Sequence, residues 1–495
     1  MAGAIPFFLP VIALVVSLIG FSSTTYPVVS SSASICVIGA GVGGSSLAYF
    51  LKTYSSDQNM PTLRIFEKSG VVGGRMATVK VVGDTFEAGA SIIHPKNMHA
   101  VRFAQLLNLK RKTRVDDDAS SIGIWDGRKF LFKTISLPPN SRFGKIISFL
   151  NSFLVLKRYG WPLFLMQRFV ERTVNCFLKY YQHFESRPVF ETVEEMLKWA
   201  NLHSLTQRSL QEQLAEAGLS QRLISELVTV ITRINYGQDV SISALAGTVS
   251  LAGSDSGLWS VEGGNWKLAD GLINHSNASL NLHEEIISVS RSGSIYVLDS
   301  TKGSSYICQV VVIATPLDEL NIDFSPPISV PQRKLQHTYT TFVRGLLNPA
   351  YFGLNSGTEI PDLVGTIEDS SLPFSCIGVQ KTYNEDDKAY KVFSRSALPE
   401  DLLDQIFSTR KETIQLNWAA YPHFEAPEVF APFVLDGFHL YYINAFENAA
   451  STIETSSVAA ENVARLILTR LASGSPSNVN HLWMPASEYG QHVDL

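Results

Sequence analysis

The sequence predicts an α/β fold in which a nucleotide-binding domain, built from discontinuous segments, is interleaved with an α+β domain. Residues 35–67 follow the order strand, glycine-rich turn, helix and strand, which is typical of a β-α-β unit. The run VVVI at 310–313 is apolar throughout, as in a strand buried on both faces of a parallel sheet. A strand at 441–444 and an alanine-rich helix at 453–471 supply a third part of the domain.

The length of the chain, 495 residues, predicts two or more domains because it exceeds what one simple core holds. Residues 192–235 form the longest predicted helical region, with Leu223, Ile224 and Val228 on its buried face. The predicted segments, in chain order, are a signal peptide or N-terminal anchor (1–31), the first nucleotide-binding segment (32–95), the helical part of a substrate domain (96–245), the second nucleotide-binding segment (246–320), the substrate-domain sheet (321–430), the third nucleotide-binding segment (431–472) and a polar tail (473–495).

The N-terminus is apolar, and the first charged side chain is Lys52. Residues 5–21 are uncharged and precede the small, polar run 22–25, which is typical of a secretory signal peptide. Pro6 and Pro10 argue against a membrane-spanning helix, although an uncleaved anchor stays open. Two adjacent glycosylation sequons, at Asn274 and Asn277, agree with a secretory route.

Charge and cysteine usage narrow the function classes. The net charge of −5 leaves no basic excess to neutralise phosphates, which argues against nucleic acid as a partner. The four cysteines match no zinc-binding spacing, so no metal site is predicted. Cys36 and Cys308 lie in apolar, strand-like runs, and we expect both to be buried free thiols.

The motif with the clearest chemical meaning is the glycine-rich turn at 39–44. It follows a strand and opens a helix, so that backbone amides at the helix N-terminus face a pyrophosphate. Glu67 ends the next strand, where an acidic side chain accepts hydrogen bonds from ribose hydroxyls. An ordinary turn and a surface glutamate are the alternative. The dinucleotide-binding residues predicted from this unit are Gly39, Ala40, Gly41, Gly43, Gly44, Glu67 and Lys68.

A second glycine pair distinguishes FAD from NAD. Gly73, Gly74 and Arg75 follow six residues after Glu67, and this arrangement resembles the amine oxidases, phytoene desaturases and related flavoproteins. The resemblance implies a Rossmann-like FAD-binding domain in which Arg75 reaches the phosphates. It also implies that the segment containing Ala90, Ser91 and Ile92 runs along the flavin ring. A solvated role for Arg75 is the alternative.

Further segments resemble the same flavoproteins in the same order. The strand that contains Ile286 resembles the one whose backbone meets the adenine, and 310–316 resembles the strand that returns to the cofactor. The family's C-terminal flavin motif usually carries Gly-Thr where this chain has Ala445 and Phe446, which implies contacts through the backbone. Ile453, Glu454 and Thr455, at the start of the last helix, complete the predicted FAD-binding residues.

Three stretches narrow the resemblance to the prenylcysteine oxidase (farnesylcysteine lyase) family. These are 261–268, 337–345 and 441–460. The resemblance implies an enzyme that oxidises the thioether of farnesylcysteine or geranylgeranylcysteine with FAD and O2. The products it implies are a prenyl aldehyde, free cysteine and hydrogen peroxide, and the implied compartment is a lysosome or vacuole.

The implied chemistry places modest demands on the protein. The carbon beside sulfur is also allylic, so positive charge there is stabilised by both neighbours, and the protein mainly positions that carbon and delivers water. Glu447, His337 and Arg344 are the candidate catalytic residues, together with His94.

The substrate also needs an apolar slot. The aromatic-rich stretch 143–169 could line that slot, rest on a membrane surface as a peripheral contact, or pack as an ordinary helical core. Other flavin enzymes acting on amines or polyenes, a non-redox prenyl carrier of the GDP-dissociation-inhibitor type, and a lipid-binding flavoprotein stay open as alternatives. The oligomeric state is not predicted.

Overall fold

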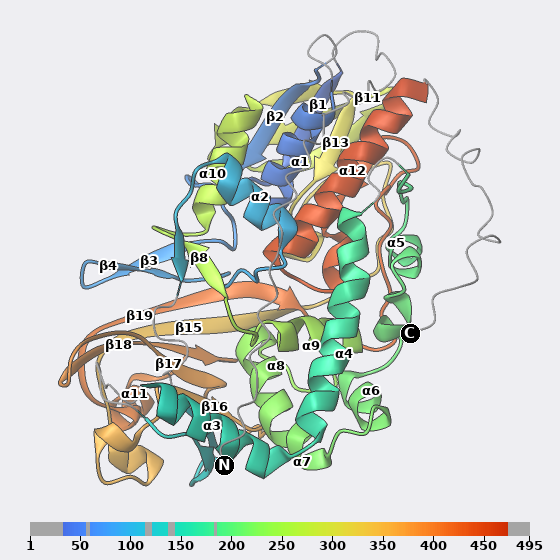
Figure 1. The fold of residues 1–495 in the computed structure, drawn as a ribbon. Coiled ribbons are helices and arrows are strands. Elements are labelled where there is room, and N and C mark those ends of the chain that lie inside the picture. Colours follow the sequence, from blue (N-terminus) through green and yellow to red (C-terminus); the bar gives the residue numbers. More distant parts are fainter. Residues whose placement is uncertain (1–32, 56–59, 114–120, 137–143, 183–185, 474–495) are drawn as a thin grey trace.

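A computed structural model describes residues 33–55, 60–113, 121–136, 144–182 and 186–473. The predicted signal peptide or anchor at 1–31 lies outside the described residues, as does the predicted polar tail beyond residue 473. Figure 1 shows a sheet-and-helix unit at the top, a broad sheet below it and a cluster of helices beside that sheet.

The upper unit is built on a five-stranded parallel sheet, which confirms the predicted fold class. Its strands come from separate parts of the chain, as expected for a domain built from discontinuous segments. The strand order across the sheet is β20 (Leu440–Tyr442), β13 (Val310–Ile313), β1 (Ser34–Ile38), β2 (Thr62–Glu67) and β9 (Ser279–Leu282). β13 is buried along its whole length, which explains its uninterrupted apolar sequence.

Helices cover the parallel sheet (Figure 1). α1 (Val42–Tyr54) begins within the glycine-rich motif and packs against α12 (Ile453–Ser473), where the Ser46 and Ser457 hydroxyls lie 3.1 Å apart. The small side chains on these two helices permit this close approach. The remaining helices of the unit are α2 (Met98–Leu106) and α10 (Trp266–Ser276).

A four-stranded sheet packs on this unit and corrects one prediction. Its strand order is β12 (Ser305–Cys308), β11 (Ile295–Ser300), β10 (Ile286–Ser292) and β14 (Asp323–Ser325). Cys36 of β1 and Cys308 of β12 form a disulfide, with Cα atoms 5.9 Å apart, so the prediction of free thiols was wrong. Both residues are buried, as expected. The two cysteines are 272 residues apart, so the sequence alone does not indicate that the fold brings their sulfur atoms together.

The lower unit contains a seven-stranded sheet. Its strand order is β19 (Phe407–Pro422), β15 (Leu335–Leu347), β18 (Asp387–Ser394), β17 (Cys376–Asn384), β16 (Leu363–Thr366), β6 (Ile122–Trp125) and β7 (Phe130–Lys133). β6 and β7 lie inside the segment 96–245, which was predicted to be helical, because strands of four residues leave little periodic signal. Two small sheets join the units, namely β3 (Thr78–Val81) with β4 (Asp84–Glu87), and β5 (Arg111–Thr113) with β8 (Trp259–Val261).

Helices from the middle of the chain lie beside the large sheet (Figure 1). The predicted buried face of 192–235 is confirmed, since Leu223, Ile224 and Val228 are fully buried. Among the described residues, no helix is both long enough and apolar enough to cross a membrane. The helices beside the large sheet are α3 (Gly144–Tyr159), α4 (Pro162–Phe177), α6 (Leu210–Glu216), α7 (Gln221–Leu223), α8 (Thr229–Tyr236) and α9 (Ala244–Ala252). In contrast, α5 (Val193–Trp199) packs into the core of the parallel-sheet unit, and α11 (Glu400–Ile406) directly precedes β19.

Candidate functional site

The glycine-rich turn lies at the carboxyl ends of three parallel strands, β1, β2 and β13. Gly39 has a φ of +111°, and a Cβ at that position would lie 2.7 Å from the Ala314 carbonyl oxygen. A Cβ at Gly44 would lie 2.1 Å from the Gly39 oxygen, so α1 approaches the turn as closely as only glycine allows. Contacts with backbone oxygens therefore explain why both positions are glycine.

The N-terminus of α1 is suited to a phosphate. Gly41 is its N-cap residue, no side chain caps the helix, and no acidic residue occupies its first turn. Free backbone amides and the helix dipole together attract an anion. A Cβ at Gly41 would meet only the Gly73 oxygen, at 3.8 Å, so this glycine leaves open space at the helix end.

Glu67 closes the other side of the turn. Its buried carboxylate accepts hydrogen bonds from the Ala40 amide, at 3.0 Å, and from the Ser69 amide, at 2.9 Å. The neighbouring Lys68 side chain is exposed. An uncapped helix end with a carboxylate at the end of the second strand fits a dinucleotide.

The second glycine pair lies against the first turn. The Gly73 amide donates to the Ala40 carbonyl at 2.9 Å, and Gly73 and Gly74 both have positive φ angles. This path brings Arg75 towards the lower unit, where its guanidinium donates to the Ala420 carbonyl of β19 at 2.7 Å. Arg75 therefore lies where the two units meet.

A buried charge cluster connects Arg75 with two distant parts of the chain. Glu447 is ion-paired with Arg75 through one carboxylate oxygen and with Arg333 through the other, at 3.1 Å. Arg333 also pairs with Asp318 at 2.6 Å. Although burial opposes ionisation, the Arg75 and Arg333 guanidiniums lower the pKa of Glu447 to about 2. Glu447 is therefore a permanent carboxylate at neutral pH.

The segment predicted to run along the flavin ring is held by Asn265. The Asn265 side chain donates to the Ala90 carbonyl at 2.8 Å, and its backbone amide donates to the Glu87 carboxylate at 2.7 Å. Burial raises the pKa of Glu87 to about 7. Ser91 and Ile92 follow with partly exposed side chains, and the Ser91 hydroxyl donates to the Gly89 carbonyl. The buried Lys391 ammonium donates to the Glu87 carbonyl at 2.9 Å.

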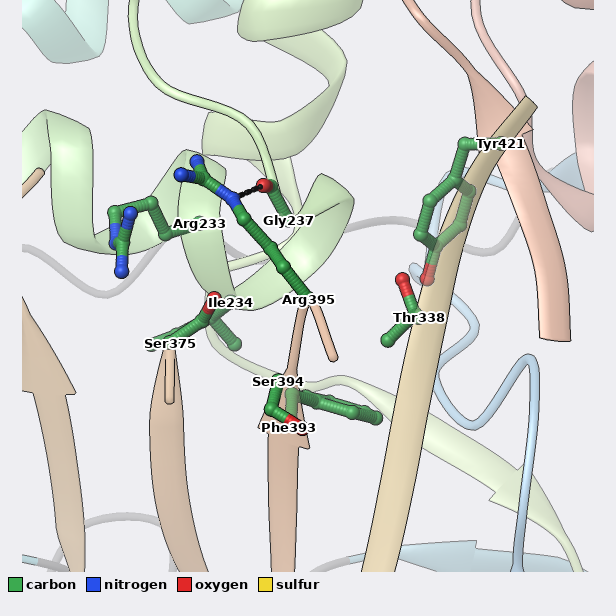
Figure 2. Close-up of a pocket in the computed structure, with 9 residues that line it drawn as sticks. All are labelled: Arg233, Ile234, Gly237, Thr338, Ser375, Phe393, Ser394, Arg395 and Tyr421. Carbon is green, nitrogen blue, oxygen red and sulfur yellow. Dashed lines mark hydrogen bonds between the residues drawn. The ribbon is translucent and has the colours of Figure 1, made fainter. Parts of the chain in front are cut away.

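A small recess of about 10 Å³, close to the volume that one water molecule needs, lies between α8 and the large sheet (Figure 2). Arg233 comes from α8, Thr338 from β15 and Tyr421 from β19, while Arg395 follows β18. Tyr421 is next to Ala420, which accepts the hydrogen bond from Arg75, so the recess adjoins the charge cluster. Both arginines donate to Glu368, which neutralises one of the two cations.

The residues of the predicted C-terminal flavin motif lie in two different surroundings. Ala445 and Phe446 are buried in the 3-10 turn 443–448, and the Phe446 ring meets Tyr180. The Glu454 carboxylate points to α2, where it accepts the His99 amide at 2.7 Å and the Tyr181 hydroxyl at 2.6 Å.

Other predicted residues of the cofactor set pack nearby. Ile453 is buried at the start of α12, and the Thr455 hydroxyl donates to the Ala450 carbonyl at 2.8 Å. Ile286 is buried at the start of β10. Cofactor contact stays a prediction for all of these residues.

The candidate catalytic residues are not gathered in one place. Arg344 pairs with Asp387 at 2.8 Å and lies over the Tyr383 ring. These partners are different from those of Arg75 and Glu447. His337 is half-exposed on β15, 3.5 Å from Glu319. His94 pairs with Asp255. Of the predicted catalytic residues Glu447, His337 and Arg344, only Glu447 belongs to the charge cluster.

The sequence reasoning missed Arg333, Lys391 and the arginines of the recess. Arg333 lies between strands in a segment without periodicity, so no local pattern marks it. Lys391 offered one signal, because it is a lysine inside the apolar run AYKVF. A cation in such a run is either exposed on one face or buried with partners, and here it is buried.

Comparison with known proteins agrees with this geometry. Residues 144–480 match the family model described as prenylcysteine lyase, and residues 37–107 match an NAD(P)-binding Rossmann-like domain. The chain is 56% identical over 444 residues to farnesylcysteine lyase of Arabidopsis thaliana, covering 89% of each chain. It is 31% identical over 473 residues to human prenylcysteine oxidase 1, covering 88% of this chain and 89% of that protein.

Solved structures share the fold. Cyclohexylamine oxidase from Brevibacterium oxydans superimposes with a TM-score of 0.58 at 18% identity, over 89% of this chain and 100% of that one. A putrescine oxidase mutant superimposes with a TM-score of 0.60 at 12% identity, over 89% of this chain and 99% of that one. Identities this low show a common fold and no more.

Proposed function

The chain belongs to the prenylcysteine lyase family, and on that premise we propose that it cleaves farnesylcysteine by oxidising the thioether. It is an oxidoreductase with FAD as its cofactor, in keeping with the Rossmann-like domain and the flavin-oxidase fold. Farnesylcysteine, O2 and water would give the prenyl aldehyde, free cysteine and hydrogen peroxide. Geranylgeranylcysteine is a second proposed substrate.

The observation that carries the proposal is the juxtaposition of a dinucleotide site with a recess in the substrate unit. The uncapped end of α1, Glu67 and Arg75 would hold FAD, and Arg75 reaches the strand that lines the recess. When bound, FAD supplies a two-electron acceptor that oxygen reoxidises with release of hydrogen peroxide.

The chain's own residues position the reactants. Glu447 is ionised throughout the neutral range, so it holds Arg75 and Arg333 in place and is unsuited to donating a proton. The carbon beside sulfur needs no strong base, because sulfur and the alkene both stabilise positive charge there. After this carbon has given up a hydride to the two-electron acceptor, water would add to it and release a proton, and the resulting hemithioacetal would collapse to aldehyde and thiol as its C–S bond breaks.

We propose that Arg395, which lines the recess, contacts the carboxylate at the amino-acid end of the substrate. A guanidinium is well suited to a carboxylate, and Arg395 is accessible, whereas Arg233 is buried and paired with Glu368. Arg395 is 41% exposed, so its replacement by glutamine should leave the fold intact. The Arg395→Gln variant should raise KM for farnesylcysteine but leave KM for farnesylcysteamine, which lacks the carboxylate, unchanged. Equal effects on both compounds would reject this role. Arg208→Gln, which removes a similarly exposed arginine that is paired with Glu216, is the matched control.

We also propose a secretory location, with a lysosome or vacuole as the destination, a cleaved signal peptide and N-glycosylation. The Cys36–Cys308 disulfide supports an oxidising compartment. Asn274 and Asn277 of the two sequons are exposed, as a glycosylation acceptor must be. A peripheral contact with a membrane is part of the proposal, because the substrate carries an isoprenoid chain and α3 exposes apolar side chains.

The deciding experiment mixes the holoprotein anaerobically with farnesylcysteine while the visible flavin absorbance is recorded, with a simple amine as control. We expect bleaching with farnesylcysteine alone, followed by recovery and peroxide when oxygen is admitted. A yellow protein that is bleached only by the amine would contradict the substrate, and a colourless protein would favour a prenyl carrier.

A further inference from the structure

Helix α3 leaves an apolar face without a partner among the described residues. Its exposed large hydrophobic side chains recur three or four residues apart and therefore lie along one side of the helix. Phe149 is 72% exposed and Phe153 is 54% exposed. The remaining members on this side are Ile146, Leu150 and Leu156.

The face continues into the start of α4. Trp161 is 68% exposed, and its ring lies 5.2 Å from that of Phe164, which is also exposed. Seven of the 17 exposed large hydrophobic side chains in the described part of the chain fall between residues 146 and 164. We call these seven residues the α3 face. Figure 1 places α3 at the lower edge of the molecule, with α4 rising from it.

The opposite side of α3 is attached to the protein. The Asn151 side chain exchanges hydrogen bonds with the backbone of Ile135, at 2.7 and 3.1 Å. Arg158 makes a bidentate ion pair with Glu226, and the Tyr159 hydroxyl donates to the same carboxylate. The orientation of the helix is therefore fixed, and the α3 face is held outward.

The charge around the face is mainly positive. Residues 146–172 contain four lysines and arginines and one carboxylate, Glu171, and one of these cations, Arg158, is neutralised by Glu226. Lys157 and Arg168 are exposed in this region. Apolar side chains flanked by cations on a helix fixed at the surface suit an anionic lipid surface.

We propose that the α3 face docks the protein peripherally on an anionic bilayer. Phe149, Phe153 and Trp161 would enter the headgroup boundary, and Lys157 and Arg168 would contact lipid phosphates. A second copy of the chain is a poorer occupant, because two such faces would bring their unbalanced cations together. Docking as such does not depend on the reaction. Its purpose, collecting a prenylated substrate from the membrane, rests on the proposed function.

The test is co-sedimentation of the full chain with vesicles of phosphatidylcholine alone or mixed equally with phosphatidylserine. We expect binding to the mixed vesicles. The double variant Phe149→Ser with Phe153→Ser should weaken it by tenfold or more, since each exposed ring loses its transfer into lipid. Lys157→Glu and Arg168→Glu should each weaken it by about fivefold or more, and only on the anionic vesicles. Ile287→Ser with Ile307→Ser, which alters two exposed side chains elsewhere, should leave it unchanged.

Two results would overturn the proposal. The first is a wild-type chain that ignores both kinds of vesicle. The second is a wild-type dimer that the Phe149 and Phe153 substitutions convert to monomer, which would make a second copy the occupant. Vesicle binding is measured without substrate, so docking that persists in a protein inactive on farnesylcysteine would reject the proposed function alone.

Discussion

Replacement of Glu447 by glutamine should destabilise the protein and weaken its hold on FAD. Glu447 is ionised between Arg75 and Arg333, and its pKa of about 2 compares with 4.5 for a free side chain. The lowered pKa corresponds to roughly 3 kcal/mol at neutral pH, which is close to the usual cost of breaking a buried ion pair. The measurement is urea unfolding of the holoprotein, together with the flavin absorbance of the purified variant.

The pH dependence of this loss is fixed by the direction of the shift. A carboxyl whose folded pKa is lowered stabilises the protein above its unfolded pKa, and that stability disappears as pH falls from 4.5 through 2. At pH 3 the contribution of Glu447 should be only about 1 kcal/mol, so wild type and Glu447→Gln should differ by about 2 kcal/mol less than at pH 7.

Asp387→Asn provides the matched control. It breaks the ion pairs with Arg344 and Lys411, in a part of the sheet that shares no contact with Arg75. We expect this variant to lose stability while retaining the full complement of FAD. If Glu447→Gln were as stable as wild type at pH 7, or if both variants released FAD equally, the charge cluster would not have the role argued for it.

Three further perturbations test separate parts of the structure. Glu87→Gln should reduce the dependence of stability on pH between pH 4.5 and 7. The raised pKa of Glu87 makes wild type lose about 3 kcal/mol of unfolding free energy as pH rises through that window. If calorimetry gave the variant the same change of stability with pH as wild type, this reasoning would be rejected. Gly41→Ala should fold with a normal unfolding midpoint yet bind FAD at least about tenfold more weakly, as measured by flavin fluorescence. Gly44→Ala should fail to fold. If instead Gly41→Ala failed to fold and Gly44→Ala folded with weak FAD binding, the turn would not face the phosphates. Replacing Cys36 and Cys308 by serine should lower the free energy of unfolding by roughly 3–5 kcal/mol in urea under oxidising conditions. If the variant stays equally less stable than wild type after the wild-type disulfide is reduced, packing of the two side chains rather than the cross-link is responsible.

The sequence could predict the parallel sheet because its elements carry local signals. The order strand, glycine turn, helix and strand at 35–67 is a local signal, and backbone contacts of Gly39 and Gly44 explain why glycine is required at these two positions of the turn. The run 310–313 likewise reports its own burial through an unbroken apolar sequence. Residues 39–44, Glu67 and 73–75 could be proposed as a binding site on the same local grounds.

The features that sequence reasoning missed depend on contacts between distant segments. Arg333 has partners at 318 and 447, and neither spacing forms a pattern. The disulfide joins residues in two different sheets, and hydrophobicity alone describes a buried thiol and a buried half-cystine equally well. Helix α3 posed the opposite difficulty, because the apolar spacing that predicts a packed helix also describes one whose apolar face points outward.

The charge cluster explains how two interleaved units can present one site. Arg75 follows the second glycine pair, Arg333 leads into the large sheet, and Glu447 lies between the last strand and last helix of the parallel-sheet unit. The attraction between one carboxylate and two guanidiniums offsets the free-energy cost of burying the charges only when all three groups are in place. The geometry of each segment therefore depends on the other two. Arg75 thereby acquires a fixed position between the dinucleotide turn and Ala420, next to the recess. The site would be lost if any one of the three segments shifted, which is why a fold assembled from separated parts of the chain can still hold a cofactor and a substrate in register.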